Sequence, residues 1–235
     1  MGAFQPEPGA LIGNADADGE LTFTWNEVGQ FWPYAEIDTR TSMSQYPAPT
    51  FECTATSINL SPGWNFVSTP KKLKDGHCTV QQVFGDIDTG ERSIRLYDAF
   101  ASSWGGTGMA PGDDVKPLDG IWIYSVGPDE VYLILNAYPR DVPPTKILGA
   151  GWNAIGFSDT TEASANSTLM SVEAQWAYVI GFDAANQQYE PSIINNDQGE
   201  GAHNEGGNMR PGKGYWIYMT DSKELAGIRP PVKSQ

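Results

Sequence analysis

The chain is poor in the residues on which most catalytic and metal-binding sites depend. Its 235 residues include two cysteines, two histidines and 14 basic residues against 29 acidic ones, so the formal net charge is −15. It has no G-x-S-x-G, no H-E-x-x-H, no P-loop and no dinucleotide-binding glycine motif. An acidic surface repels phosphate backbones, which excludes nucleic acid as an expected partner. These absences predict a noncatalytic protein.

Long apolar runs are also missing. Gly, Pro, Asn or a charged residue interrupts every apolar stretch well before the length that a membrane-spanning helix needs, so we predict no membrane span. The first residues, Met1 to Pro6, lack the basic and apolar regions of a secretory signal. Two interpretations follow: the protein stays inside the cell, or the sequence is that of a mature fragment.

The chain carries the same pattern twice. A Gly-Trp-Asn motif at 63–65 and 151–153 opens each copy, and the segments GIWIY at 120–124 and GYWIY at 214–218 close them. Between these motifs, an aromatic residue followed by aspartate occurs at 97–98 and 182–183. Six residues after each aspartate comes another aromatic residue, Trp104 or Tyr189. Three matches in the same order indicate a duplicated unit.

Residue patterns within each copy favour strands. Ile58–Pro70 and Ile147–Phe157 combine β-forming residues with Gly or Pro turns, whereas Cys78–Phe84 and Ser167–Trp176 suit one or two helical turns. We predict a mainly β fold of the β-rich α+β type. Its two tandem antiparallel β modules, 56–140 and 141–235, each have one short helix and follow a small N-terminal segment, 1–55. A module of this size buries only about 60–65% of its unfolded surface, so we expect the two to pack together.

The repeated unit resembles a recognisable module. The order of GWN, short helix, aromatic-Asp hairpin and Pro-x-x-Gly-Tyr-Trp-Ile-Tyr at 211–218 is similar to the "GWN…GYWIY" repeat of secreted and cell-envelope proteins of archaea and bacteria. The first copy departs from it at Leu118-Asp119 and at Ile121, and the second departs at 154–157. The resemblance covers residues 57–225. It implies an extracellular or cell-surface location and a noncatalytic structural or adhesive role, and it names no ligand.

The N-terminal segment contains an acidic loop that resembles the calcium loop of dockerins and EF-hands. Oxygen-bearing side chains at alternate positions can converge on one calcium ion, and Gly19 permits the tight turn. A loop that starts at Asn14 has Trp25 at its twelfth position, whereas one that starts at Asp16 has Glu27 there. An acidic surface turn is the alternative. The predicted calcium ligands are Asn14, Asp16, Asp18, Glu20 and Glu27.

The two cysteines, Cys53 and Cys78, flank the first GWN strand and do not follow a metal-ligand spacing. One interpretation is a disulfide, which would stabilise the fold by about 3 kcal/mol on chain-entropy grounds. The other is a pair of reduced, buried thiols.

The leading hypothesis is a cell-surface or secreted structural or adhesive protein. It would be stabilised by calcium and would assemble with other copies of itself or with other surface proteins, as in an envelope layer, filament or adhesin. The alternative is a carbohydrate-binding module in which exposed aromatic rings stack on sugars, with Trp104 and Tyr189 as the first candidates. A hydrolase acting on glycans would instead need two facing carboxylates.

The aromatic residues present in both copies are expected to pack in the shared core. Function is therefore expected where the copies differ. Such places are the first 55 residues, the cysteine pair and the insertion Asn195–Asn208, in which His203 is expected to be a solvated loop residue.

Overall fold

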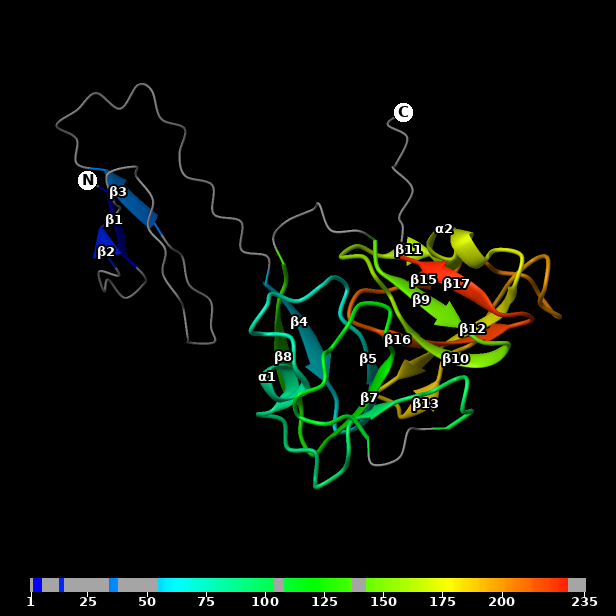
Figure 1. Ribbon diagram of the computed structural model, residues 1–235, viewed down its shortest axis with the longest axis horizontal. Coiled ribbons are helices and arrows are strands. Elements are labelled where there is room, and N and C mark those ends of the chain that lie inside the picture. Colours follow the sequence, from blue (N-terminus) through cyan, green and yellow to red (C-terminus); the bar gives the residue numbers. More distant parts are fainter. Residues whose placement is uncertain are drawn as a thin grey trace. The chain divides into compact units, whose positions relative to one another are not determined.

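The computed structural model describes residues 2–5, 13–14, 34–37, 55–103, 108–136 and 143–227. The chain forms two compact units, residues 1–53 and 54–235. In the first unit, β1 (Gly2–Gln5) pairs with both β2 (Gly13–Asn14) and β3 (Tyr34–Ile37) in an antiparallel sheet. Both predicted modules lie in the second unit (Figure 1). The fold is mainly β with short helices, which confirms the predicted class.

The second unit contains two copies of one plan, here named repeat 1 (residues 55–136) and repeat 2 (residues 143–227). Repeat 1 contains β4 (Ala55–Leu60), β5 (Gly63–Val67), α1 (Val80–Phe84), β6 (Arg95–Leu96), β7 (Ile121–Ser125) and β8 (Asp129–Ile134). Repeat 2 contains β9 (Thr145–Leu148), β10 (Gly151–Gly156), β11 (Ala163–Ser164), α2 (Ala165–Thr168), a 3₁₀ turn (Met170–Val172), β12 (Trp176–Asp183), β13 (Gln188–Tyr189), β14 (Ile193–Ile194), β15 (Asn208–Met209), β16 (Gly214–Met219) and β17 (Lys223–Ala226).

Strand pairing follows the duplication. The first and last strands of each repeat pair with each other, β4 with β8 and β9 with β17. The strand that GWN opens pairs with the closing strand, in equivalent registers: Trp64 lies opposite Tyr124, and Trp152 lies opposite Tyr218. The next strand, β6 or β12, lies on the other side of the closing strand. Consequently β5 and β10 are edge strands of their sheets.

The two helices begin at hydroxyl caps. Thr79 forms a capping box with Gln82 before α1, and the Ser164 side chain accepts from the backbone N–H of Ser167 at the start of α2. The helix of repeat 2 therefore begins at Ala165, two residues earlier than the segment predicted from Ser167. The Ser164 cap explains the difference, because a Ser before a helix satisfies an otherwise unpaired N–H.

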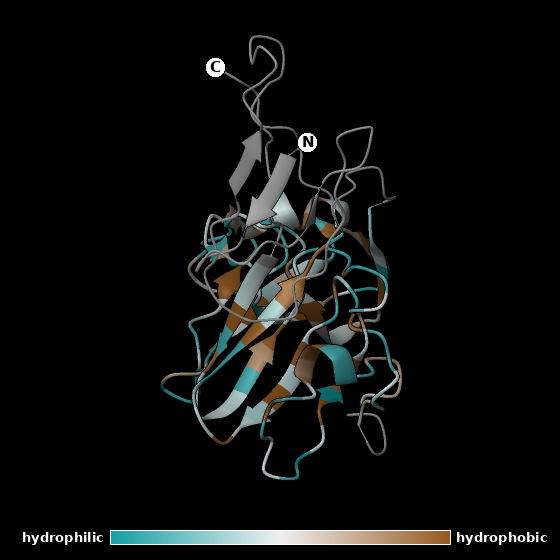
Figure 2. Cartoon of the chain, turned by 90° about the vertical axis from the view of Figure 1, so that its left-hand side faces the viewer, coloured by the Kyte–Doolittle hydropathy of each residue, from teal (hydrophilic) through white to brown (hydrophobic). Residues whose placement is uncertain are grey.

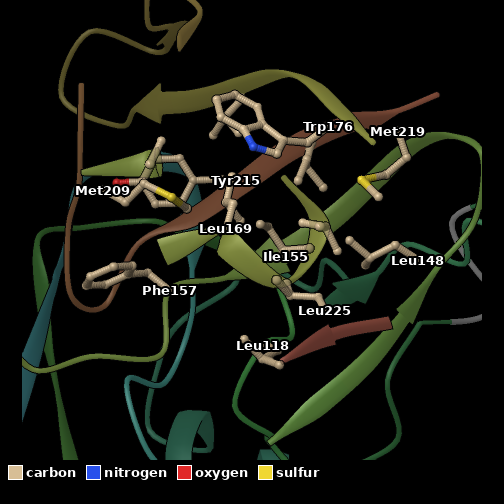
Figure 3. Packing of buried hydrophobic residues seen from close by; sticks show 14 residues of the cluster. Leu118, Leu148, Ile155, Phe157, Leu169, Trp176, Met209, Tyr215, Met219 and Leu225 are labelled. Atoms are coloured by element: carbon tan, nitrogen blue, oxygen red, sulfur yellow. The ribbon is translucent and has the colours of Figure 1, made fainter. Parts of the chain in front are cut away.

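Each repeat has its own apolar core, built from alternate residues of its strands. In the closing strands, Ile121 and Ile123 point into the core of repeat 1, and Tyr215 and Ile217 point into that of repeat 2. Figure 2 shows the apolar residues concentrated on the strands. Leu118 of repeat 1 joins the core of repeat 2, where Figure 3 shows it among that core's side chains.

The asparagine of each GWN motif holds a turn. Asn153 is buried, its Nδ2 donates to the carbonyls of Gly149 (2.8 Å) and Gly151 (3.0 Å), and its Oδ1 accepts from Gly149 N (2.9 Å). Asn65 makes the same three hydrogen bonds to Ser61 and Gly63. The motif glycine has a φ of +103° at Gly63 and +92° at Gly151, a conformation that favours glycine. The GWN motif thus forms the turn that leads into each edge strand, β5 or β10.

Candidate functional site between the repeats

The repeats meet through matched backbone hydrogen bonds. Ser68 N donates to the carbonyl of Gly212 at 3.0 Å, and Gly156 N donates to the carbonyl of Leu118 at 2.9 Å. Gly156 occupies the position in repeat 2 that Ser68 has in repeat 1, so the contacts are related by a pseudo-two-fold axis. The expectation that the two modules pack together is confirmed.

Aromatic rings fill the interface in the same symmetric manner. Tyr97 of repeat 1 meets Trp216 of repeat 2 edge-on, with ring centroids 5.0 Å apart. Phe182 of repeat 2 meets Trp122 of repeat 1 edge-on at 4.8 Å, and Phe66 stacks on Trp122 at 4.6 Å. These tryptophans point outward from their own sheets, opposite to the core residues beside them. The expectation that the recurring aromatics pack in the shared core is confirmed for Trp122, which is buried, and Trp216 packs against the same cluster, which lies where the two repeats meet.

The glycine at the start of each closing segment, Gly120 before β7 and Gly214 as the first residue of β16, allows this close approach. A Cβ on Gly120 would lie 2.7 Å from the carbonyl oxygen of Ile155, and a Cβ on Gly214 would lie 2.5 Å from the ring of Phe66. Both distances are too short for real carbon contacts, so any larger residue would separate the repeats.

The pseudo-two-fold axis generates two equivalent grooves, one on each side of the interface. The groove beside Trp64, here the closed groove, is filled by Gln187 from the hairpin of repeat 2. Gln187 Oε1 accepts from Trp64 N at 2.8 Å, and its Nε2 donates to Trp64 O at 2.9 Å. A Cβ on Gly63 would lie 2.6 Å from the Gln187 side chain, which shows how tightly the carboxamide is packed there.

The groove beside Trp152, here the open groove, has no such side chain among the described residues. The residue equivalent to Gln187 is Ser102; the two share a left-handed backbone, with φ of +52° and +48°. Within the same described part of the chain, nothing lies within 4 Å of a Cβ placed on Gly151, the counterpart of Gly63. The open groove has a volume of about 340 Å³, and its lining residues are Tyr97, Trp152, Ile180, Tyr189 and Trp216.

Two rings of the open groove are strongly exposed: Tyr189 at 57% and Trp152 at 40%. Large aromatic side chains are normally buried, so an exposed pair in one groove makes it the candidate site. Trp152 is held by an edge-on contact with Tyr218 at 5.2 Å, and Tyr189 by one with Phe182 at 5.5 Å. The rings are therefore oriented before any ligand arrives.

A second cleft, of about 520 Å³ and lined by both apolar and charged residues, adjoins the open groove, because Tyr97 lines both. Lys146 crosses its base, donating from Nζ to Asp119 (2.7 Å) and to the carbonyl of Ala154 (3.0 Å). Asp98, Asp113 and Asp114 supply further carboxylates to the lining. An aromatic surface thus continues into a cleft of hydrogen-bonding groups, as in many small-ligand sites.

The aspartate of each aromatic-Asp pair closes its hairpin. Asp98 Oδ1 accepts from the backbone N–H groups of Phe100 and Ala101, and Asp183 Oδ1 accepts from those of Ala185 and Asn186. The Asn186 side chain also donates to Asp183 at 2.8 Å, and this hydrogen bond lowers the pKa of the Asp183 carboxyl. These carboxylates are occupied by turn formation, so their recurrence is structural.

Of the two predicted stacking residues, the structure places Tyr189 in the open groove, whereas Trp104 lies outside the described residues. The calcium prediction also stays untested: Asp16, Asp18, Glu20 and Glu27 lie outside the described residues, and Asn14 is described only as the backbone of β2. Among the residues that the structure does describe, no group of three or more His, Cys, Asp or Glu side chains is placed to hold a metal ion.

The structure does not contain the disulfide expected from the cysteine pair. Cys78 is a free, half-buried thiol whose Sγ lies 3.7 Å from Asp114 Oδ1, and Cys53 lies outside the described residues. The thiol sits beside the capping box of α1, where Gln82 Oε1 accepts from Cys78 N at 3.0 Å. Cys78 thus contributes to repeat 1 as a small side chain beside its core.

The insertion Asn195–Asn208 is anchored to repeat 2. Asn195 is buried and donates to the carbonyls of Glu173 and Trp176, and Glu200 N donates to the hydroxyl of Tyr178 at 2.9 Å. His203 is exposed and its Nδ1 lies 2.6 Å from Asn196 Oδ1. The expectation of a solvated histidine is confirmed.

Sequence reasoning missed Trp152 and the pair Ser102 and Gln187. The recurrence of Trp152 predicts a core residue. Its counterpart in repeat 1, Trp64, is half-buried beneath Gln187, whereas Trp152 is exposed. The available signal was the Ser-for-Gln difference four residues after Asp98 and Asp183.

In the described part of the chain, the helices are all too short to cross a bilayer. Compared with known proteins, the chain matches no family model, no curated protein and no solved structure.

Proposed function

We propose that this chain is a noncatalytic structural or adhesive module of a secreted or cell-surface protein. The observation that carries the proposal is the use of the recurring residues. Asn65 and Asn153 hold turns, Asp98 and Asp183 close hairpins, and Trp122 and Trp216 join the repeats. The recurring residues therefore hold the fold and join the two repeats into one unit. A module that bears mechanical force or displays a contact surface needs such a unit.

The likeness to surface-protein repeats gives the expected location, and the net charge of −15 suits a protein that stays dispersed until it meets a defined partner. The partners are other copies of the chain or other surface proteins. Calcium bound by the acidic loop at Asn14–Glu27 would stabilise the first unit, because carboxylates are the ligands that calcium prefers.

Surface labelling tests the location. Antibodies raised against the chain are expected to bind intact producing cells or their medium; a signal confined to the lysate contradicts the proposal. Light scattering of the full chain tests assembly, and monomers at all salt and calcium concentrations contradict it.

Calcium is tested separately by thermal unfolding in millimolar CaCl₂. An ion that binds the folded state alone raises the midpoint. The rise is expected in the native chain and is expected to disappear in the double variant Asp16→Asn/Asp18→Asn. The variant Asp86→Asn changes an exposed carboxylate of repeat 1 and serves as the control, since it should keep the full rise. No rise in the native chain removes calcium from the proposal.

A further inference from the structure

The geometry points to the open groove as a binding site for a neutral carbohydrate. This inference rests on the proposed adhesive function and names the ligand class of its contact surface. The rings of Trp152, Tyr189 and Trp216, with Tyr97 at the boundary, supply flat apolar faces in a groove of about 340 Å³. A pyranose ring presents a face of C–H groups, which packs on an aromatic face while its hydroxyls point outward.

The backbone of Trp152 supplies a hydrogen-bonding pair beside these rings. Along β10, Gly156 N bonds to Leu118 O and Ala154 O accepts from Lys146, so both groups point away from the paired strand β16. Residues two positions apart on a strand direct their N–H and C=O groups to the same edge. The N–H and C=O of Trp152 therefore also point away from β16. The groove thus offers one donor and one acceptor next to the Trp152 ring.

The closed groove shows what such an edge recognises. There the carboxamide of Gln187 presents one acceptor to Trp64 N and one donor to Trp64 O. Two adjacent hydroxyls of a sugar present the same pair side by side, because each hydroxyl can donate and accept. A saccharide in the open groove can therefore satisfy at Trp152 the contacts that the protein's own glutamine satisfies at Trp64.

Charge selects a neutral sugar over an anionic one. The chain carries a net charge of −15, and four carboxylates line the adjoining cleft, Asp98, Asp113, Asp114 and Asp119, against two cations, Lys116 and Lys146, of which Lys146 is paired with Asp119. Because the carboxylates outnumber the cations in this lining, they repel uronates and sulfates, and those of Asp113 and Asp114 can accept hydrogen bonds from sugar hydroxyls.

The test is isothermal titration calorimetry of the full chain with cellopentaose, mannopentaose and N-acetylchitopentaose, beside trigalacturonic acid and the peptide Gly-Gln-Gly. At least one neutral oligosaccharide is expected to bind at one site per chain. Trp152→Ala and Tyr189→Ala are each expected to weaken binding by about tenfold. Tyr132→Ala is the matched control, because Tyr132 is a 41% exposed aromatic outside the groove, and binding should be unchanged.

The variant Ser102→Gln is the most decisive part of this test. Position 102 already has the backbone conformation of position 187, so the new carboxamide is expected to reach Trp152 and abolish sugar binding without lowering the melting temperature. Binding that survives both Ser102→Gln and Trp152→Ala places the sugar elsewhere and overturns the inference. No binding of any neutral oligosaccharide, or binding of the peptide or trigalacturonic acid alone, also overturns it. Surface location and assembly are measured separately, so they stand or fall independently.

Discussion

The closed and open grooves have the same frame, and the contact that fills the closed one comes from the hairpin side chain Gln187, whose counterpart is Ser102. Each is bordered by a tryptophan from a GWN motif, by the ring that precedes the hairpin aspartate of the other repeat, and by the tryptophan of a closing strand. In the closed groove, Gln187 bonds to both backbone groups of Trp64. In the open groove, the equivalent Ser102 is too short to do so. The duplicated fold thus fills the groove of one copy with its own side chain and leaves the groove of the other copy open.

The difference teaches where to look for function in a repeat. Residues present in both copies, such as Asn65 and Asn153, have the same contacts twice and report on the fold. Trp64 and Trp152 are also present in both copies, yet Trp152 is exposed and Trp64 is half-buried, because their neighbours differ. A repeated residue can therefore be structural in one copy and available for binding in the other.

The largest effect is expected from breaking the interface that both grooves share. Gly120→Ala would place a Cβ 2.7 Å from the carbonyl oxygen of Ile155, a backbone atom that moves only with its strand. We expect a loss of about 2 to 3 kcal/mol in the free energy of unfolding, measured with urea. Gly127→Ala is the control, since its Cβ meets no described atom within 4 Å. Equal stability of the two variants would mean that the repeats do not pack as described.

The next effect tests whether the two turns are energetically equivalent. Asn153→Ala and Asn65→Ala each remove three hydrogen bonds from a buried turn, so each is expected to cost about 2 kcal/mol. Asn59→Ala, at an exposed position of β4, should change stability by less than about 0.5 kcal/mol. A large difference between the two turn variants would show that the duplication is not reflected in stability.

Much of the fold could be predicted from the sequence because the signals are local and doubled. The strand that starts at GWN, a short helix in each repeat and the closing strands follow from turn residues and β-forming residues, whereas the start of the second helix at the Ser164 cap was not predicted. The interface could not be predicted, because alternation along a strand does not say which face meets the other repeat. Trp122 and Ile123 are adjacent and both hydrophobic, yet one faces the interface and the other the core. Tyr189 could be named as a candidate from its position in the hairpin. Trp152 could not, because the sequence does not say which of the two GWN tryptophans is exposed.

A smaller effect is expected from opening the closed groove. Gln187→Ala removes three exposed hydrogen bonds, two with the backbone of Trp64 and one to the carbonyl of Ala184, and should cost about 1 kcal/mol. The more informative measurement is acrylamide quenching of tryptophan fluorescence, which should increase as Trp64 becomes accessible. Gln188→Ala changes the exposed neighbour and should leave quenching unchanged. Unchanged quenching in Gln187→Ala would mean that another group covers Trp64, and Gln187 would then not account for the closed groove.

The smallest effect is a pH dependence at the hairpin that carries Gln187. The side-chain hydrogen bond from Asn186 lowers the pKa of Asp183 below its usual value, so the ionised carboxylate favours the folded state. That contribution is present above the unfolded pKa of an aspartate, about 3.9, and is lost as the pH falls through the lower folded value. Asn186→Ala should raise the pKa of Asp183, which NMR titration of the carboxyl carbon measures directly. An unchanged pKa would mean that the backbone N–H groups of Ala185 and Asn186 alone hold the carboxylate. The hairpin turn would then be as simple as that of Asp98, leaving Gln187 as the distinguishing contact of its groove.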